Sequence, residues 1–333
     1  AILAAKECCE QLGKELPVLV SMTFEANGRT FTGCCVPSMA AVIEGLGADA
    51  IGFNCSLGPV ELLPFARQLR ENTSLPIFIK PNAGLPDPLT GSYSIDAAKF
   101  ADCMQEYLAL GIHLFGGCCG TDPSFIRAMR QMLDQKHPQD FPNPVVSRQA
   151  CVCTPTCFVP IDRVRIIGER INPTGKKRLK QAILEQDFDY ILSQGLSQLE
   201  AGAQILDVNM GMPEVDESRM LPLVIQKLQG VLDAPLQIDS SNVKAIEQAL
   251  RLYNGKPIVN SVNGEEGSMN TILPLVKKYG AAVVALTLDD NGIPLLAEER
   301  FAIAERIVAH AEQYGISRED IYVDCLTLTA SVQ

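Results

Sequence analysis

The sequence has little basic charge and no long apolar run. Its 28 Lys and Arg residues are outnumbered by 39 Asp and Glu residues, which gives a formal net charge of -11. A surface of this sign repels the phosphates of nucleic acids and anionic lipids, so we expect no nucleic-acid partner. The longest apolar runs, such as residues 281–286, are as long as a strand and far shorter than the ~20 residues of a membrane span. We therefore expect no membrane partner.

Low-complexity segments and a secretory leader are also missing. The composition, 47% hydrophobic and 20% charged, can bury a substantial core and excludes a disordered chain. Because a single core stops growing near ~250 to 300 residues, a chain of 333 residues predicts two domains. Without a charged-then-apolar leader, the 12 cysteines of this acidic chain favour reduced thiols and metal ligation over disulfides. We therefore expect a cytoplasmic protein.

Two series of short β-rich runs, separated by helix-patterned segments, make up most of the chain. The first series lies at residues 18–23, 50–55, 77–80 and 112–115. The second series lies at residues 164–168, 205–209, 236–239, 258–262, 283–288 and 321–326. Strands that alternate with helices at this spacing predict an α/β fold with parallel sheets and right-handed crossovers.

Neither series has the eight units of a complete TIM barrel. We therefore expect two TIM (βα)8-type barrels in tandem, both truncated, with the C-terminal half of the first in residues 1–142 and the N-terminal part of the second in residues 161–333. Residues 143–160, which are rich in proline and show little periodicity, are the predicted linker. A doubly wound open sheet is the alternative for either half, although no G-x-G-x-x-G motif follows a first strand.

Three cysteines lie where predicted strands of the first series end. Cys55 closes one run, and Cys118 and Cys119 follow another after two glycines. Loops at the carboxyl ends of parallel strands converge on one mouth. Three thiolates can hold Zn²⁺ and leave a fourth position open for an incoming thiol, whose pKa the metal lowers. We expect a catalytic metal site here, although free cysteines in proteins often only fill space.

Another group of cysteines lies in the predicted linker. Cys151, Cys153 and Cys157 place three sulfurs within seven residues, close enough for local metal ligation. A fourth ligand is not evident, because the nearest histidine, His137, lies in a run without periodicity. We treat this group as the weaker alternative metal site. The cysteines that we interpret as structural are Cys8, Cys9, Cys34, Cys35 and Cys103.

Polar side chains mark the predicted strand ends of the second series. They are Glu169, Asn172, Asp207, Asn209, Asp239, Asn260 and Asp324. A carboxylate suits the guanidine-like edge of a pterin because it accepts paired hydrogen bonds, and an amide suits the mixed edge beside it. The alternative is helix capping, which strand-end Asp and Asn often perform. Asp239, just before Ser240-Ser241-Asn242, fits that alternative better than Asp207 does.

The cysteine motifs resemble those of a known family. Gly-Phe-Asn-Cys at residues 52–55 and Gly-Gly-Cys-Cys-Gly-Thr at residues 116–121 look like the paired signature of the homocysteine methyltransferases. The resemblance implies that homocysteine is a substrate and that Cys55, Cys118 and Cys119 are zinc ligands. Residues 80–86 resemble the strand-end loop between the two motifs. Asn82 in this loop is thereby a weaker candidate for the wall of the homocysteine pocket.

The second series resembles the pterin-binding barrel of folate and corrinoid methyltransferases, a plan that dihydropteroate synthases share. The resemblance implies that methyltetrahydrofolate binds at these strand ends. The residues implied to contact the pterin ring are Asp207, Asn209, Asp239 and Asp324, with Glu169, Asn172 and Asn260 nearby.

Together the two resemblances cover residues 1–142 and 160–333, in the order found in cobalamin-dependent methionine synthases. They imply a methyltransferase that makes methionine from homocysteine and 5-methyltetrahydrofolate through methylcobalamin, with the cobalamin bound by a domain or protein outside this chain. A betaine-type homocysteine methyltransferase would explain only the cysteines. A dihydropteroate synthase or a corrinoid/folate methyltransferase would explain only the second half. A structural zinc module would predict a closed site with four ligands.

Overall fold

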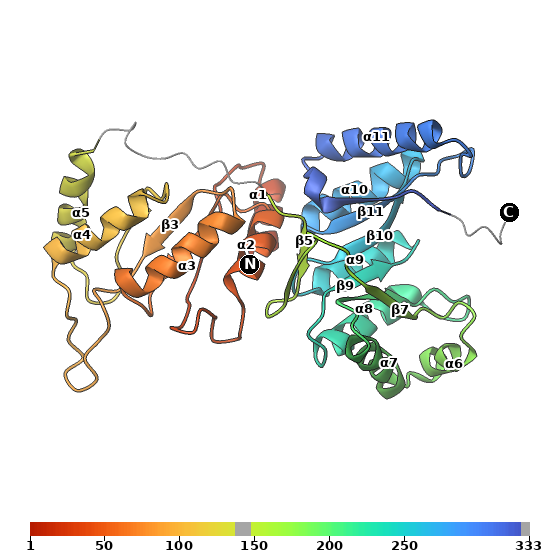
Figure 1. Cartoon of the computed structure of the whole chain (residues 1–333), viewed down its shortest axis with the longest axis horizontal. Coiled ribbons are helices and arrows are strands. Elements are labelled where there is room, and N and C mark those ends of the chain that lie inside the picture. Colours follow the sequence, from red (N-terminus) through yellow and green to blue (C-terminus); the bar gives the residue numbers. More distant parts are fainter. Residues whose placement is uncertain (137–147, 328–333) are drawn as a thin grey trace. The chain divides into compact units, whose positions relative to one another are not determined.

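The computed structural model describes residues 1–136 and 148–327 and divides the chain into two compact units (Figure 1). The first unit is Ala1–Arg148 and the second is Gln149–Gln333, so the boundary falls within the predicted linker. His137 and residues 143–147 of that linker lie outside the described residues. Among the helices that are described, none is long and apolar enough to cross a membrane.

The first unit contains a four-stranded parallel sheet. Its strands lie side by side in chain order as β1 (Leu19–Met22), β2 (Ala50–Asn54), β3 (Ile77–Lys80) and β4 (Leu114–Phe115). Its helices are α1 (Ile2–Gln11), α2 (Val36–Gly45), α3 (Pro59–Asn72), α4 (Ala97–Leu108) and α5 (Pro123–Asp134). Consecutive helices pack against one another from α2 to α5. The apolar strand β2 is buried along most of its length, as expected for a parallel strand that is covered on both faces.

Side chains that suit helix N-termini start the helices after β3 and β4. Asp96 caps α4 by accepting a hydrogen bond from the backbone N–H of Lys99, and Asp122 caps α5 by accepting one from Ser124. Pro123 follows as the first residue of α5, where its missing N–H would have had no partner within the helix. These caps fix where the loops at the carboxyl end of the sheet stop.

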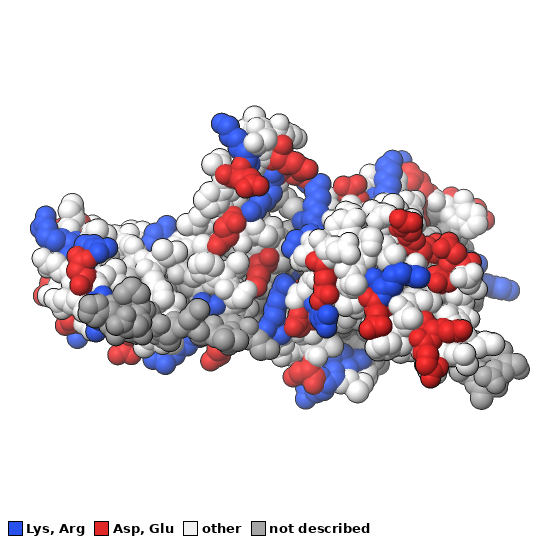
Figure 2. Space-filling model, turned by 90° about the horizontal axis from the view of Figure 1, so that it is seen from above, with Lys and Arg blue, Asp and Glu red and all other residues white. Residues whose placement is uncertain are grey.

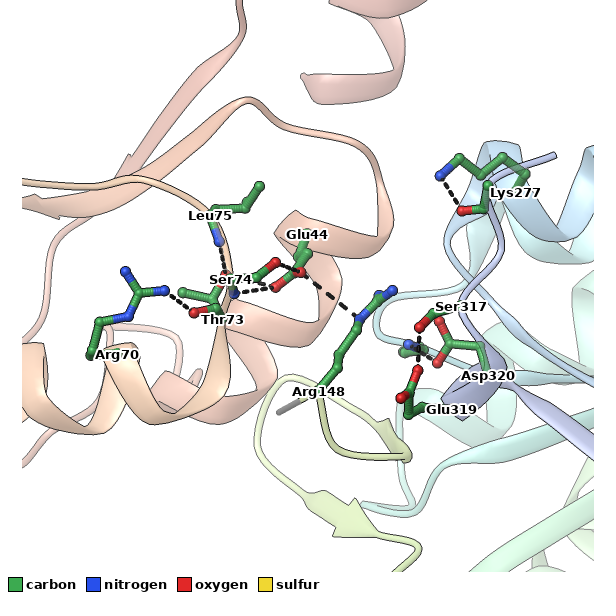
Figure 3. A network of polar contacts seen from close by, with 12 residues as sticks. Glu44, Arg70, Thr73, Ser74, Leu75, Arg148, Lys277, Ser317, Glu319 and Asp320 are labelled. Atoms are coloured by element: carbon green, nitrogen blue, oxygen red, sulfur yellow. Dashed lines mark hydrogen bonds and ion pairs between the residues drawn. The ribbon is translucent and has the colours of Figure 1, made fainter. Parts of the chain in front are cut away.

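The last described part of the first unit is held by Glu44 (Figure 3). The Glu44 carboxylate, on α2, accepts hydrogen bonds from the hydroxyls of Thr73 and Ser74, both at 2.6 Å. Its Oε1 atom also lies 3.8 Å from Nε of Arg148. This network joins Arg148 to α2 and to the loop before β3.

The second unit contains a six-stranded parallel sheet, again ordered as in the chain. Its strands are β7 (Ile167–Ile171), β8 (Ile205–Asn209), β9 (Leu236–Asp239), β10 (Ile258–Asn263), β11 (Ala282–Leu286) and β12 (Ile321–Asp324). Its helices are α6 (Lys177–Glu185), α7 (Phe188–Glu200), α8 (Glu217–Gln229), α9 (Val243–Leu252), α10 (Glu266–Tyr279), α11 (Ala297–Gln313) and the short 3₁₀ helix η2 (Arg318–Asp320).

The two sheets confirm the predicted parallel βα repeats. The tandem barrels are not confirmed, because neither sheet closes within the described residues: β1 and β4 are the edges of the first sheet, and β7 and β12 those of the second. One strand is shifted from its expected position. The run at residues 164–168 predicts a strand that ends before Glu169, whereas β7 begins at Ile167 and contains Glu169. Val164 is instead 93% exposed and lies outside the sheet.

Residues 151–160 of the predicted linker form an antiparallel hairpin of β5 (Cys151–Cys153) and β6 (Phe158–Pro160). Val152 and Val159 of this hairpin pack against residues at the amino ends of strands in the six-stranded sheet, which are Ile205, Ile258 and Ala282. Backbone hydrogen bonds in both directions join Cys153 to Lys256. The hairpin therefore covers the amino end of the second sheet and leaves its carboxyl end for polar residues.

Acidic and basic side chains are interspersed on the face that Figure 2 shows. The described part of this face carries no continuous basic area.

A buried ion pair beside the hairpin should stabilise the second unit. Nζ of Lys256 lies 2.5 Å from Oδ1 of Asp320, with side chains only 2% and 8% exposed. Asp320→Asn leaves the ammonium buried without a carboxylate, so we expect the free energy of unfolding to fall by about 3–5 kcal/mol. Urea denaturation measures this change. Glu312→Gln, which removes an exposed partner of Arg318, is the control and should leave the midpoint nearly unchanged. Equal midpoints for both variants would contradict the role of the buried pair.

Candidate functional site

The carboxyl end of the four-stranded sheet brings three cysteines together. The Sγ atoms of Cys55 and Cys119 are 3.7 Å apart, and those of Cys118 and Cys119 are 3.9 Å apart. All three sulfurs lie within 4.8 Å of one another. Cys55 follows β2, and the other two follow β4. The structure therefore groups the three cysteines that the strand-end pattern singles out.

Irregular backbone makes this grouping possible. Cys55 and Ser56 both adopt left-handed conformations, with φ of 65° and 64°, so the chain turns sharply at the end of β2. Cys118 donates its backbone N–H to Pro81 O, and the Thr121 hydroxyl donates to Cys118 O. These contacts hold residues 118 and 119 in a turn. Adjacent side chains would point in opposite directions on a strand, whereas here both sulfurs reach the same place.

Two side-chain amides contact the cysteines. The Asn54 side-chain amide donates to Cys118 Sγ at 3.8 Å. The buried Asn82 side chain accepts a hydrogen bond from the backbone N–H of Cys119 at 3.2 Å. A backbone hydrogen bond from Ser56 lowers the pKa of Cys55, whereas burial raises the pKa of Cys118. Cys55 is therefore the cysteine of this pair that ionises more readily.

The sulfur spacing fits a zinc ion. Tetrahedral zinc with Zn–S bonds of ~2.3 Å places two sulfurs ~3.8 Å apart. The two sulfur–sulfur distances of 3.7 and 3.9 Å match this value. Among the described residues, no fourth His, Cys, Asp or Glu joins the group, and Cys119 is exposed. An external ligand can therefore reach the site, as an open metal site requires.

The alternative metal site in the linker is not supported. Cys151 and Cys153 are buried in β5, and Cys157 packs partly buried against the cluster under the hairpin. The three do not form a group with metal-ligand spacing in the part of the chain that the structure describes.

A polar face marks the second sheet. The register of β8 with β9 places Asp207 opposite Gln237, and Asn209 opposite Asp239. On the other side of β9, Asp239 lies opposite Asn260 of β10. Because side chains alternate along a strand, these five residues point to one face of the sheet. The Asn209 amide donates to Asp239 Oδ2 at 2.9 Å, and the Gln237 amide donates to Asp207 Oδ1 at 2.6 Å. The structure therefore joins four side chains in two hydrogen-bonded pairs.

Gln237 is a site residue that the sequence pattern missed. It lies inside the predicted strand 236–239 rather than at its end, and only 8% of its surface is exposed. Its polarity within an apolar run was the available signal, because a buried amide requires a hydrogen-bonding partner.

Burial controls the charge of the acids on this face. Desolvation, together with the charge of Asp239, raises the pKa of Asp207 to about 7, although the Gln237 hydrogen bond opposes the shift. Desolvation also raises the pKa of Asp239, against the hydrogen bond from Asn209. Burial therefore favours the protonated form of both carboxyl groups on this face.

Helix capping does not account for these acids. Asn242 caps α9 by accepting hydrogen bonds from the backbone N–H groups of Lys244 and Ala245. Asp239 accepts from Asn209, and Asp207 is 3% exposed inside the sheet. Both carboxyl groups are therefore available for a role other than capping.

The remaining predicted residues lie at the rim. Glu169 forms an ion pair with Lys176 at 3.0 Å, and its charge helps to raise the pKa of Asp207. Asn172 accepts a hydrogen bond from the Thr174 backbone. Asp324 is exposed on the edge strand β12, and two strands separate β12 from β9. The structure thus groups these three residues less closely than the hydrogen-bonded pairs.

Comparison with known proteins finds a different family match for each unit. Residues 1–133 match the homocysteine S-methyltransferase family, and residues 168–333 match the pterin binding enzyme family. The methionine synthase of Mycobacterium leprae (strain TN) is 30% identical over 346 residues, which cover 99% of this chain and 28% of that protein. The methionine synthase of Mycobacterium tuberculosis (strain ATCC 25618 / H37Rv) is 30% identical over 342 residues, with the same coverage.

Over nearly its whole length the chain is similar to methionine synthases. It spans about 28% of the length of these methionine synthases. Both resemblances that the motifs indicate are confirmed. Among solved structures, dihydropteroate synthase of Xanthomonas albilineans with 4-aminobenzoic acid is 22% identical, with 53% of this chain and 64% of that chain covered and a TM-score of 0.42.

The raised pKa of Asp207 predicts a pH-dependent stability. An unfolded chain has an aspartate pKa near ~3.9, so the folded protein binds more protons between pH ~4 and about 7. The stability contributed by protonated Asp207 is complete below this window and is lost as pH rises through it. Asp207→Asn, which stays neutral, should remove about 2–3 kcal/mol of the difference in unfolding free energy between pH 5 and pH 8. Urea denaturation at the two pH values measures this.

Asp216→Asn is the control for this measurement. Hydrogen bonding to Ser218 lowers the pKa of Asp216. Replacing Asp216 should therefore leave the decrease in unfolding free energy between pH 5 and pH 8 as large as in the parent protein. If the unfolding free energy decreased equally in Asp207→Asn and in the parent protein, the raised pKa of Asp207 would be contradicted.

Proposed function

We propose that this chain is the part of a methionine synthase that binds homocysteine on its first unit and 5-methyltetrahydrofolate on its second. The observation that carries the proposal is the group of three sulfurs at a strand-end mouth, in a chain that also presents a polar face on a second parallel sheet. In this proposal the two sheets are parts of (βα)8 barrels, the first within residues 1–142 and the second within residues 161–333.

The first unit would hold zinc through Cys55, Cys118 and Cys119. Zinc, when bound, lowers the pKa of a homocysteine thiol, so that the thiol ligates as a thiolate at neutral pH. The protein supplies orientation: the Asn54 amide donates to one sulfur, and the buried Asn82 carbonyl holds the turn that carries Cys119. The exposure of Cys119 supports access of the amino acid from solvent.

The second unit would bind the pterin ring at its polar face. The Asp239 carboxylate can accept paired hydrogen bonds from the ring N–H and the exocyclic amine, and the Asn209 amide fixes its orientation. Asp207 lies deeper in the same face, where Gln237 supports it. The other residues proposed to line this site are Glu169, Asn172, Asn260 and Asp324.

The transfer between the two substrates requires a carrier. Methylcobalamin, when bound by a domain or protein outside this chain, would carry the methyl group from methyltetrahydrofolate to homocysteine. A betaine-type homocysteine methyltransferase would leave the polar face of the second unit unexplained. A structural zinc module is disfavoured by the three-ligand group, and a dihydropteroate synthase or corrinoid/folate methyltransferase by the cysteines themselves.

The proposal predicts that the chain binds about one zinc ion and that Cys118→Ser loses it. Metal analysis after dialysis measures the zinc content of each variant. Cys103→Ser is the matched control, because Cys103 lies on α4 outside the sulfur group and should retain zinc. Full zinc in Cys118→Ser would refute the assignment. Loss of zinc in Cys153→Ser alone would instead assign the metal site to the hairpin.

The proposal also predicts that Asp239→Asn weakens binding of methyltetrahydrofolate. The amide places a donor opposite a donor of the pterin, which should cost on the order of 2–4 kcal/mol, or a factor of ~30 to 1000 in Kd. Calorimetric titration of the chain measures the affinity. Asp233→Asn is the control, because Asp233 accepts hydrogen bonds from Thr154 and Thr156 of the hairpin at the opposite end of the sheet. Equal affinities for the two variants would remove Asp239 from the site.

A further inference from the structure

A groove on the second unit is lined by residues of α6, α8 and α9 and by the loop before α8. Its volume is about 710 Å³, which lies within the ~300 to 1,000 Å³ of small-molecule sites. Leu184 of α6 and Leu252 of α9 line the groove and are 52% and 46% exposed. The groove therefore has an apolar wall that is open to solvent, and neither proposed substrate site uses it.

Two segments that line the groove begin at the polar face of the second sheet. β8 ends at Asn209, and the loop that follows it reaches the groove at Glu214. α6 is the first helix after β7, and its start is held there because Lys176 Nζ donates to Glu169 Oε2 and to Asn172 O. Short segments therefore connect the groove to the edge of the sheet where the pterin ring is proposed to bind.

Cations accompany the apolar wall. Arg219, in the first turn of α8, and Arg251, in the last turn of α9, line the groove. Lys180 precedes Leu184 by four positions and so lies on the groove side of α6, with Lys177 on the same side one turn earlier. Both lysines are exposed, and neither forms an ion pair with another described residue. The groove is therefore suited to a ligand that combines methylene groups with negative charge.

The charge at the start of α6 also favours an anionic ligand. The first turns of α8, α10 and α11 carry glutamates, which suit the partial positive charge of a helix N-terminus. α6 instead begins with Lys177 and Arg178 and has no acidic residue in its first turn. Arg178 is paired with Asp187, whereas Lys177 has no such partner in the described part of the chain. A bound anion would compensate this unfavourable arrangement.

We propose that the groove, together with Lys177 and Lys180, binds the glutamate tail of the folate substrate. The tail is a chain of γ-linked glutamates, each of which carries a carboxylate and a short run of methylene groups. The methylene groups suit the apolar wall, and the carboxylates suit the lysines and Arg219, whose guanidinium can donate two hydrogen bonds to one carboxylate. The tail site rests on the proposed folate function and adds a subsite that does not contact the pterin ring.

Two acids also line the groove and allow the sign of the interaction to be tested. Asp216 accepts a hydrogen bond from the Ser218 hydroxyl at 2.7 Å, so its carboxylate is already occupied. Glu214 is exposed and would repel a carboxylate of the tail. Removing a cation should therefore weaken binding of the tail, whereas removing the charge of Glu214 should strengthen it.

Calorimetric titration of the chain with the monoglutamate and triglutamate forms of 5-methyltetrahydrofolate tests the tail site. In the parent chain the triglutamate form should bind about three- to tenfold more tightly, as two partly screened ion pairs would give. The double variant Lys180→Gln/Arg219→Gln should bring the ratio of the two Kd values close to one. Glu214→Gln should raise the ratio about twofold. A thermal melt checks that each variant is folded.

A charge-matched double variant is the control. Lys227→Gln/Lys278→Gln removes the same charge from the last turns of α8 and α10, outside the groove, and should leave the ratio unchanged. Raising the ionic strength from about 0.01 to about 0.15 M shortens the Debye length from ~30 to ~8 Å. The ratio should then fall in the parent chain and stay near one in Lys180→Gln/Arg219→Gln.

The outcomes separate the tail site from the folate function. Equal affinities of the parent chain for both forms, or a ratio that survives in Lys180→Gln/Arg219→Gln, would overturn the tail site and leave the folate function in place. An equal fall of the ratio in the control would show attraction by overall charge only, and would also overturn the site. A parent chain that binds neither form would overturn the folate function, and the tail site with it.

Discussion

Parallel strand pairing is the constraint on which both candidate sites depend. Every strand of a parallel sheet ends at the same edge, so residues far apart in the chain meet there without any local signal between them. Cys55 and Cys119 are separated by 64 positions, yet their sulfurs are 3.7 Å apart. Asp207 and Gln237 are 30 positions apart and meet because β8 pairs with β9 in one register. A shift of one residue would turn Asp207 to the opposite face of the sheet.

In the second sheet, the two ends of a strand also differ in the kind of residue that they carry. Along β8, the alternating residues Ile205, Asp207 and Asn209 change from apolar to polar towards the carboxyl end. The apolar end is covered by the β5–β6 hairpin, whose Val152 packs against it. A buried carboxyl group is tolerable only where hydrogen bonds reach it, and Gln237 supplies one to Asp207. The hairpin thus contributes apolar packing at one end of the sheet, and the polar pairs lie towards the other.

The strands were predictable from sequence to the extent that burial gave them short apolar runs, as at β2, β8 and β9. Cysteines and acids after such runs likewise indicated where a site would form. Contacts that depend on distant partners left no such pattern. Gln237 looked like a break in a strand, since only register shows its partner Asp207. The prolines near the hairpin obscured two strands of three residues each, because their stability comes from packing on the second sheet.

Both candidate sites gather groups that resist being charged together. Three sulfurs crowd at one mouth, and on the other sheet the charges of Asp239 and Glu169 help to raise the pKa of Asp207. Folding alone gains nothing from such clusters, since like charges and desolvation oppose ionisation. A metal cation removes this cost from the thiolates, and ligand N–H groups remove it from the carboxylates. If the proposed ligands bind, each would bind the folded arrangement far better than the unfolded chain, and its binding free energy would add to the stability of the unit that holds it. On this reasoning, the features that weaken each unit alone are the ones that make it selective for its proposed ligand.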